Sequence, residues 1–168
     1  PEGYLVSEEV IPATITKLLS LSTSLTSGQI VKMVDEDWEN NTTYICLEKR
    51  SSDTKCTDGN PHYSLNGATY KVFKTNEAAS NALATKNYSA AIGTLTVDEN
   101  GNSGVLEVTD YMNKNSKTGM FEKTTFYVVE SKTGKGYELD TEVYHLDETL
   151  ANTEKNPATL KVTDEPVN

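Results

Sequence analysis

Short stretches in which apolar and polar residues alternate recur along the chain, and turn-forming residues separate them. Residues 44–49 and 68–73 alternate in this way, and residues 124–130 are the richest in the aromatic and β-branched residues that strands favour. Residues 98–102 read Asp-Glu-Asn-Gly-Asn, which is a strong turn signal. Many short strands joined by turns, with little helix, predict an all-β fold: an Ig-like or prealbumin-like β-sandwich with a Greek-key-type strand order.

The remaining segments complete this pattern. Residues 92–97 and 104–108 flank the turn and are expected to be short strands. Residues 137–144 and 158–162 are expected to be the closing strands. The alanine-rich residues 76–91 are compatible with either a short helix or a long loop.

Length and charge narrow the class of function. The chain has 168 residues, enough for one ordinary domain or a domain plus a fragment, and a net charge of -10. A surface this acidic repels phosphate backbones and anionic lipid. We therefore expect no nucleic-acid partner and no membrane-surface role. No apolar run approaches the roughly 20 residues of a membrane helix, so we expect no membrane insertion either.

The two cysteines, Cys46 and Cys56, do not form a metal motif with the nearby His62. Their spacing lacks the paired CxxC pattern of zinc sites, and we expect no metal and no cofactor. In an oxidising compartment the two thiols could form a disulfide across a short hairpin. The alternative is a pair of unrelated buried thiols. Neither interpretation indicates catalysis.

An internal repeat affects how the chain divides. Residues 3–10 resemble residues 136–143, and residues 30–36 resemble residues 157–165, in the same order. The chain also opens on Pro1 rather than Met and shows no signal peptide, so we expect it to be a piece of a longer protein.

We interpret the repeat as a domain boundary. Residues 1–37 would be the tail of a preceding repeat, or an N-terminal extension, and residues 38–168 one complete repeat of the same kind. The alternative is that residues 14–34, which contain several leucines, form an unrelated helix.

Three charged residues stand at corresponding places on three of the expected strands. Lys49 ends the first strand of the body, Glu130 ends the strand richest in β-forming residues, and Asp164 closes the last strand. Side chains of these three strands could meet inside a sandwich. Taken singly, each residue would more often face solvent at a strand end.

The segments around these residues resemble the collagen-adhesin B-type (Cna-B) and SpaA-type pilin repeats of Gram-positive surface proteins. In that family a Lys precedes a "GA-x-[FY]" strand, which residues 67–70 match after Lys49. The family's Glu lies in a "Y-x-[VL]-x-E-[TS]-x-A-P-x-G-Y" box, whose second half is matched by Glu130, Ser131, Gly136 and Tyr137 and whose first half resembles Tyr127 and Val129. Its last strand ends in "V-x-[ND]-x-P", which residues 162–166 match, and its "D-E-N-G" hairpin corresponds to residues 98–101. In two respects this chain departs from the family: Thr-Gly replaces the Ala-Pro of the box, and the loop before residue 67 is long.

The resemblance implies an autocatalytic isopeptide bond between Lys49 and Asp164, assisted by Glu130. A protein of this family is a structural stalk or adhesin module, not an enzyme. Its partners are neighbouring repeats of the same polypeptide. It lies outside the cell on the bacterial surface, anchored to the cell wall through a region beyond this fragment.

General chemistry makes this bond reasonable. Burial disfavours charge, so a buried lysine can become a neutral amine and buried carboxyl groups can hold protons. A neutral Lys49 amine can then attack the carbonyl of a protonated Asp164. A protonated Glu130 would polarise that carbonyl and relay protons as water leaves.

Three other interpretations stay open at this stage. Lys49 and the carboxylates could form a non-covalent buried pair, which is a poor source of stability because of its desolvation cost. The chain could instead be a ligand-binding adhesin domain that grips a host matrix protein or a glycan with residues 50–66 and 74–91. A carbohydrate-active enzyme is the third and weakest: the sequence is compatible with a pair of carboxylates for glycoside cleavage, but a chain with 25 acidic residues contains such pairs by accident.

Overall fold

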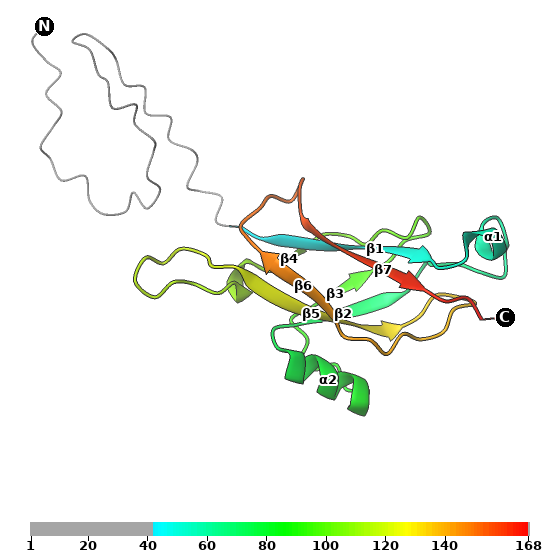
Figure 1. Ribbon diagram of the computed structural model, residues 1–168, viewed down its shortest axis with the longest axis horizontal. Coiled ribbons are helices and arrows are strands. Elements are labelled where there is room, and N and C mark those ends of the chain that lie inside the picture. The colour runs from blue at the N-terminus through cyan, green and yellow to red at the C-terminus, as the bar shows by residue number, and fades with distance from the viewer. Residues whose placement is uncertain (1–41, 168) are drawn as a thin grey trace, which may run out of the picture.

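The computed structural model describes residues 42–167, which form two β-sheets packed face to face (Figure 1). One sheet has the strand order β4-β1-β7 and the other β3-β2-β5-β6. The strands are β1 (Tyr44–Ser51), β2 (Thr69–Phe73), β3 (Gly93–Thr96), β4 (Leu106–Glu107), β5 (Thr124–Lys132), β6 (Tyr144–Thr149) and β7 (Ala158–Asp164). The helices are α1 (Thr54–Thr57) and α2 (Asn76–Thr85), with a 3₁₀ turn at Thr109–Tyr111. The expected all-β sandwich with little helix is confirmed.

Alternation along the strands directs one set of side chains into the space between the sheets. In β1, Ile45, Leu47 and Lys49 are buried, while the residues between them are partly exposed. β7 follows the same pattern up to Asp164, and β5 up to Glu130. The apolar members of this set form the main core. Each strand therefore carries a charged residue on its core face, close to the strand end.

β1 and β7 come from opposite ends of the described chain and lie side by side. They pair in parallel, from Ile45 opposite Ala158 to Ser51 opposite Asp164. Figure 1 shows both arrowheads pointing to the same end of the molecule. Lys49 pairs with Val162, two residues before Asp164 on the same face of β7. The pairing therefore brings the lysine of the first strand beside the aspartate of the last.

α2 covers the outer face of the sheet that contains β2 and β5. Phe73 and Val129 point away from the main core and pack with Ala79 and Ala82 of the helix. The helix begins after Thr75, whose hydroxyl accepts a hydrogen bond from the backbone N–H of Ala78. Of the two structures compatible with residues 76–91, the helix forms over the first ten.

The prediction of a closing strand over residues 137–144 is wrong, because β6 begins only at Tyr144. Before that residue, Tyr137 forms only an isolated bridge with Pro166, and two backbone N–H groups further along donate to side chains. The N–H of Asp140 donates to Glu130 Oε2, and that of Glu142 to Asp140 Oδ1, each at 2.8 Å. With these donors occupied, the segment forms no strand ladder.

The predicted domain boundary stays a prediction. The proposed tail of a preceding repeat, residues 1–37, lies outside the described residues. Residues 42–167 belong to the body that was interpreted as one repeat, residues 38–168.

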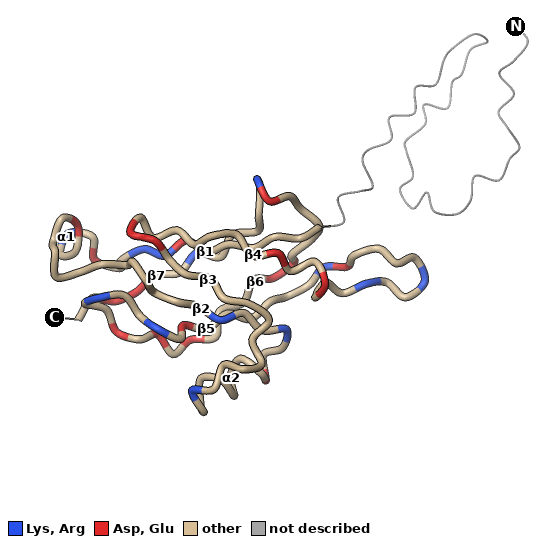
Figure 2. The backbone as a smooth tube through the Cα atoms, turned by 180° about the vertical axis from the view of Figure 1, so that it is seen from behind, with Lys and Arg blue, Asp and Glu red and all other residues tan. Residues whose placement is uncertain are grey.

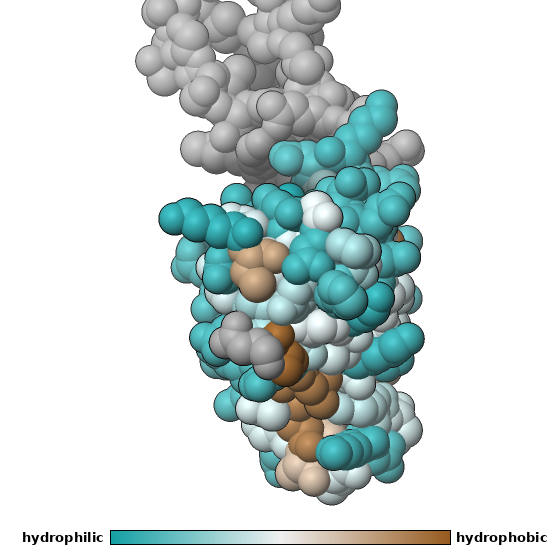
Figure 3. Space-filling view, turned by 90° about the vertical axis from the view of Figure 1, so that its right-hand side faces the viewer, coloured by the Kyte–Doolittle hydropathy of each residue, from teal (hydrophilic) through white to brown (hydrophobic). Residues whose placement is uncertain are grey.

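Most of the surface at the end where β1 and β7 finish is hydrophilic. Figure 3 views this end and shows a narrow hydrophobic stripe on an otherwise mostly hydrophilic face. Figure 2 shows both acidic and basic segments near the described C-terminus, at the same end. The apolar residues of the strands are thus mainly used between the sheets.

Gly101 lies in the turn after β3 and contacts the backbone of Lys49. Its carbonyl accepts a hydrogen bond of 2.7 Å from the backbone N–H of Lys49, and its φ is +80°. A Cβ on this residue would lie 2.2 Å from the carbonyl oxygen of Lys49. The glycine is needed both for its positive φ and for the close approach of the two backbones.

We predict that Gly101→Ala destabilises the fold more than Gly119→Ala. Both glycines have a positive φ, and alanine there costs about 1–2 kcal/mol. Only at Gly101 does the new methyl group also collide with backbone, since nothing lies within 4 Å of a Cβ at Gly119. Urea unfolding of the two variants measures the difference. Equal losses of stability would contradict this role of Gly101.

Candidate functional site

Lys49 is completely buried (0% exposed), although lysine side chains normally reach solvent. Its Nζ forms ion pairs with Glu130 Oε1 and Asp164 Oδ2, and donates a hydrogen bond of 2.8 Å to the hydroxyl of Tyr70. Within residues 42–167, these oxygens from β5, β7 and β2 match the three N–H donors of an ammonium group. The fold therefore brings together the three charged residues that the sequence singled out.

Glu130 is also completely buried and is held from two sides. Its Oε1 faces Lys49, and its Oε2 accepts a hydrogen bond of 2.8 Å from the backbone N–H of Asp140. Burial raises the pKa of Glu130 above the ordinary range of a glutamate, although the contacts with Lys49 and the Asp140 N–H oppose this shift. The carboxyl group is thus suited to hold a proton that an exposed glutamate would release.

Asp164, at the end of β7, is 3% exposed. Besides the ion pair with Lys49, its Oδ2 accepts a hydrogen bond of 3.4 Å from Thr133 Oγ1. Thr133 stands where the family box has alanine. The threonine at this place therefore adds a hydroxyl contact to the aspartate.

Tyr70 is the member of the site that sequence reasoning missed. It lies on β2, opposite Glu130 in the ladder with β5, and is fully buried. The Lys49 Nζ also lies 5.0 Å from the centre of its ring. Burial, and then the carboxylates of Glu130 and Asp164, raise the pKa of Tyr70, so its hydroxyl stays protonated. Its place in the "GA-x-[FY]" strand could have indicated that it belongs to the site. An aromatic residue at that position is, however, equally expected in an ordinary core strand.

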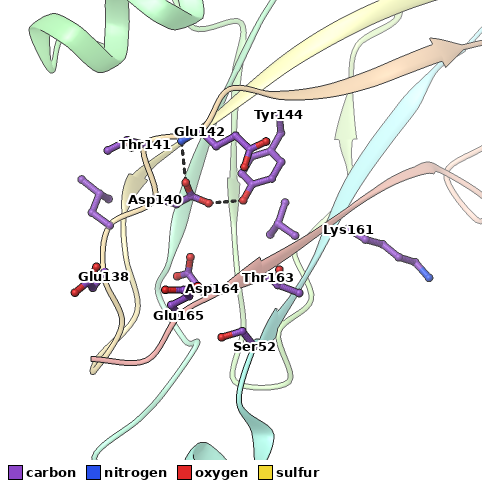
Figure 4. Close-up of a pocket in the computed structure, with 12 residues that line it drawn as sticks. Ser52, Glu138, Asp140, Thr141, Glu142, Tyr144, Lys161, Thr163, Asp164 and Glu165 are labelled. Carbon is purple, nitrogen blue, oxygen red and sulfur yellow. Dashed lines mark hydrogen bonds between the residues drawn. The ribbon is translucent and has the colours of Figure 1, made fainter. Parts of the chain in front are cut away.

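A pocket of about 550 Å³ opens beside Asp164, at the end of β7 (Figure 4). The segment before β6 forms one wall, and Tyr144 donates a hydrogen bond to Asp140 Oδ2 there. Burial, followed by the contact with Asp140, raises the pKa of Tyr144. The pocket leaves Asp164 close to solvent while the amine behind it stays dry.

The arrangement is electrostatically costly as a plain ion pair. One ammonium group and two carboxyl groups lie out of water. The free-energy cost of desolvating buried charges often exceeds the free energy gained from their attraction. Contact between an amine and a carboxyl group in a dry interior is, by contrast, the geometry that amide formation requires.

The disulfide that the sequence left open between Cys46 and Cys56 does not form, and each cysteine is a free, half-buried thiol. Cys46 lies in the middle of β1 and Cys56 in α1, beyond the end of that strand. Five residues of extended strand, each rising about 3.3 Å, separate Cys46 from Ser51, where β1 ends before α1. This separation is larger than the roughly 4.4–6.8 Å between the Cα atoms of bonded cysteines. Each Sγ instead contacts a hydroxyl, that of Thr159 or of Tyr63.

Across residues 42–167, no group of three or more His, Cys, Asp or Glu side chains is arranged to hold a metal ion. Neither is any helix in this range both long and apolar enough to cross a membrane.

No protein-family model and no curated protein matches the chain. Several solved structures are similar to it. The shaft pilin SpaA of Lactobacillus rhamnosus GG shares 15% identity over 76% of this chain and 49% of that chain, with a TM-score of 0.46. The pilus 2b backbone protein of group B streptococcus shares 18% identity over 75% of this chain and 42% of that chain, with a TM-score of 0.43.

A third similar structure is the major pilin SpaA of Corynebacterium diphtheriae, at 16% identity and a TM-score of 0.39. The similarity covers 74% of this chain and 30% of that chain. That structure is described as pointing to a modular pilus assembly with stabilizing isopeptide bonds. The chain spans less than half the length of each of these three proteins.

We predict that the raised pKa of Glu130 makes the uncross-linked fold less stable as pH rises. The contribution is fully present below the ordinary glutamate pKa, where folded and unfolded chains both bind the proton. It is lost as pH rises through the higher folded pKa, because the unfolded chain ionises first.

The comparison of Lys49→Met with Lys49→Met/Glu130→Gln isolates this effect. Removing the amine prevents cross-linking and also removes the contact that opposes the shift, so the pH dependence should be larger. Unfolding free energies between about pH 4 and pH 8 should fall with pH in the single variant relative to the double variant. Parallel curves would show that Glu130 ionises as it does in water.

Proposed function

We propose that the chain is a structural module of a bacterial surface protein of the pilus or adhesin type, locked by an autocatalytic isopeptide bond between Lys49 and Asp164. The observation that supports this proposal most is the contact of a fully buried amine with two buried carboxyl groups. Glu130 assists the reaction and Asp164 is the group attacked. The module reacts once per chain, so it is not an enzyme.

The reaction condenses an amine and an acid to an amide and water. A proton first moves from Lys49 Nζ to Asp164, leaving a neutral amine beside a neutral acid. The nitrogen then attacks the Asp164 carboxyl carbon, forming the C–N bond. A second proton leaves the nitrogen through Glu130 and joins the departing hydroxyl as the C–O bond breaks and water leaves. Glu130 ends in the protonation state in which it began.

Two features of the site supply the rate. Burial lowers the cost of the neutral amine–acid pair relative to the charged pair, so that the reactive form is populated. The strands also hold the reacting groups in contact, and well-oriented intramolecular reactions reach effective concentrations of about 10⁵–10⁸ M. The pocket beside Asp164 gives the released water a short path to solvent.

The position of the bond suits a module that carries tension. β1 and β7 are parallel, so pulling the start of β1 against the end of β7 shears their ladder. A bond between Lys49 and Asp164 joins the two strands near the pulled end of β7 and bypasses most of the described sequence. It also closes a loop of about 100 residues, which by analogy with disulfides stabilises the fold by about 4–5 kcal/mol.

The proposed setting follows from this mechanical role. The module would lie outside the cell, on the surface of a Gram-positive bacterium, with neighbouring repeats of the same polypeptide as its partners. Residues 38–168 would be one such repeat, and the cell-wall anchor would belong to another part of the protein.

The rival function, binding of a host matrix protein or glycan through loops, has less support. One of its two proposed binding segments, residues 74–91, contains α2, whose buried face is occupied by packing on β2 and β5. The other, residues 50–66, contains α1 and lines a pocket of about 410 Å³ near the 98–102 turn, and nothing in that pocket points to a particular ligand. A screen against matrix proteins and glycans tests this rival.

We predict that the intact protein is lighter than its sequence mass by one water molecule. Glu130→Ala, Glu130→Gln, Lys49→Met and Asp164→Ala should each restore the full mass of the substituted sequence, because each removes the amine, the acid or the proton relay. Intact-mass spectrometry of the denatured chains measures this directly.

The matched control is the exposed ion pair of Lys123 and Glu148, whose Nζ–Oε1 distance is 2.8 Å. Glu148→Gln should keep the mass deficit, because contact in water without burial does not promote condensation. A wild-type chain of full mass would contradict the proposal. A deficit that persisted in Asp164→Ala would place the bond elsewhere.

A further inference from the structure

The amine of Lys49 has a third partner that the reaction as described does not use. Besides the two carboxyl groups, Nζ donates to the hydroxyl of Tyr70 at 2.8 Å, inside the same dry region. Tyr70 comes from β2, a strand that contributes none of the three reacting groups. Its hydroxyl approaches the amine from a separate element of the fold.

Amide formation requires the amine to present its lone pair to Asp164. An ammonium group has three N–H donors, and three oxygens among the described residues surround it: Glu130 Oε1, Asp164 Oδ2 and Tyr70 Oη. When the proton facing Asp164 is transferred, the lone pair is left along that direction. The other two N–H groups still point at Glu130 and Tyr70.

Two anchored N–H groups fix the rotation of the amine about its Cε–Nζ bond. With Glu130 alone, the amine could turn about a single hydrogen bond and direct its lone pair away from Asp164. The phenol is poorly suited to take the proton itself, since burial and the nearby carboxylates raise the pKa of Tyr70 and keep it neutral. The N–H that it holds is therefore one that the amine keeps as it attacks.

We propose that Tyr70 is a positioning residue for isopeptide formation, whose hydroxyl holds one N–H of Lys49 so that the lone pair faces Asp164. This inference rests on the proposed function. It assigns a role to a residue outside the Lys–Glu–Asp set, and predicts that a phenylalanine at this place in the strand reacts more slowly than a tyrosine.

Among the described residues around the site, Tyr144 of β6 does not share this role. It lies beyond Asp164, on the pocket side, and donates to Asp140 instead.

The test is a time course of bond formation in the full chain. Protein is labelled in a short pulse of cell-free synthesis and quenched in denaturant at intervals, and the cross-linked fraction is read from the mass deficit. Tyr70→Phe should react about tenfold more slowly than wild type at the same pH, the effect of one neutral hydrogen bond. In the unreacted Glu130→Gln background the same substitution should leave amide hydrogen exchange in β1 and β7 unchanged, whereas a merely loosened fold would exchange faster.

Tyr63→Phe is the matched control, because its hydroxyl bonds to the backbone of Val167 and does not touch the amine. It should react at the wild-type rate. If Tyr70→Phe matches the wild-type rate, the positioning role is wrong although the cross-link stands. If wild type itself never loses water, the proposed function fails instead.

A second measurement covers the case in which Tyr70→Phe does not fold. A crystal structure of Glu130→Gln, in which the amine stays unreacted, should place Lys49 Nζ within hydrogen-bond distance of the Tyr70 hydroxyl. An amine turned away from that hydroxyl would overturn the proposal.

Discussion

The buried amine of Lys49 is the interaction on which the rest of the site depends. A lysine without access to water must satisfy three N–H donors within the protein, and an unpaired buried charge costs several kcal/mol. Across the described residues, β2, β5 and β7 each place one oxygen at the amine, which itself comes from β1. Both sheets must therefore be correctly paired and packed before all three N–H groups of the amine have partners. The site is complete only in the native fold.

This dependence links the fold to the chemistry. Until β7 docks beside β1, Asp164 is exposed and Lys49 is a solvated ammonium group that cannot react. Docking removes water, brings the amine and the acid into contact, and leaves Glu130 clamped by the backbone N–H of Asp140. Under the proposed function, condensation would then make the last step of folding irreversible, and the module would gain covalent support only in its native arrangement.

Much of this could be predicted from the sequence, because strand alternation is a local property. It predicted the strands that carry Lys49, Glu130 and Asp164, while the motifs around these residues, and not alternation, indicated that the three meet in the interior. The role of Tyr70 was missed because an inward aromatic residue is expected in any sandwich strand. The start of β6 was misplaced because, in the segment before it, two backbone N–H groups donate to the side chains of Glu130 and Asp140. The periodicity of the sequence does not reveal such hydrogen bonds.

The most direct test of the central claim is to identify the bonded residues by peptide mapping. The denatured protein is digested with a protease that leaves residues 49 and 164 in separate peptides, and the fragments are sequenced by tandem mass spectrometry. The account predicts one branched peptide in which the side chain of Lys49 is joined to that of Asp164, with one water lost. Recovery of both residues only in separate linear peptides of full mass would contradict it.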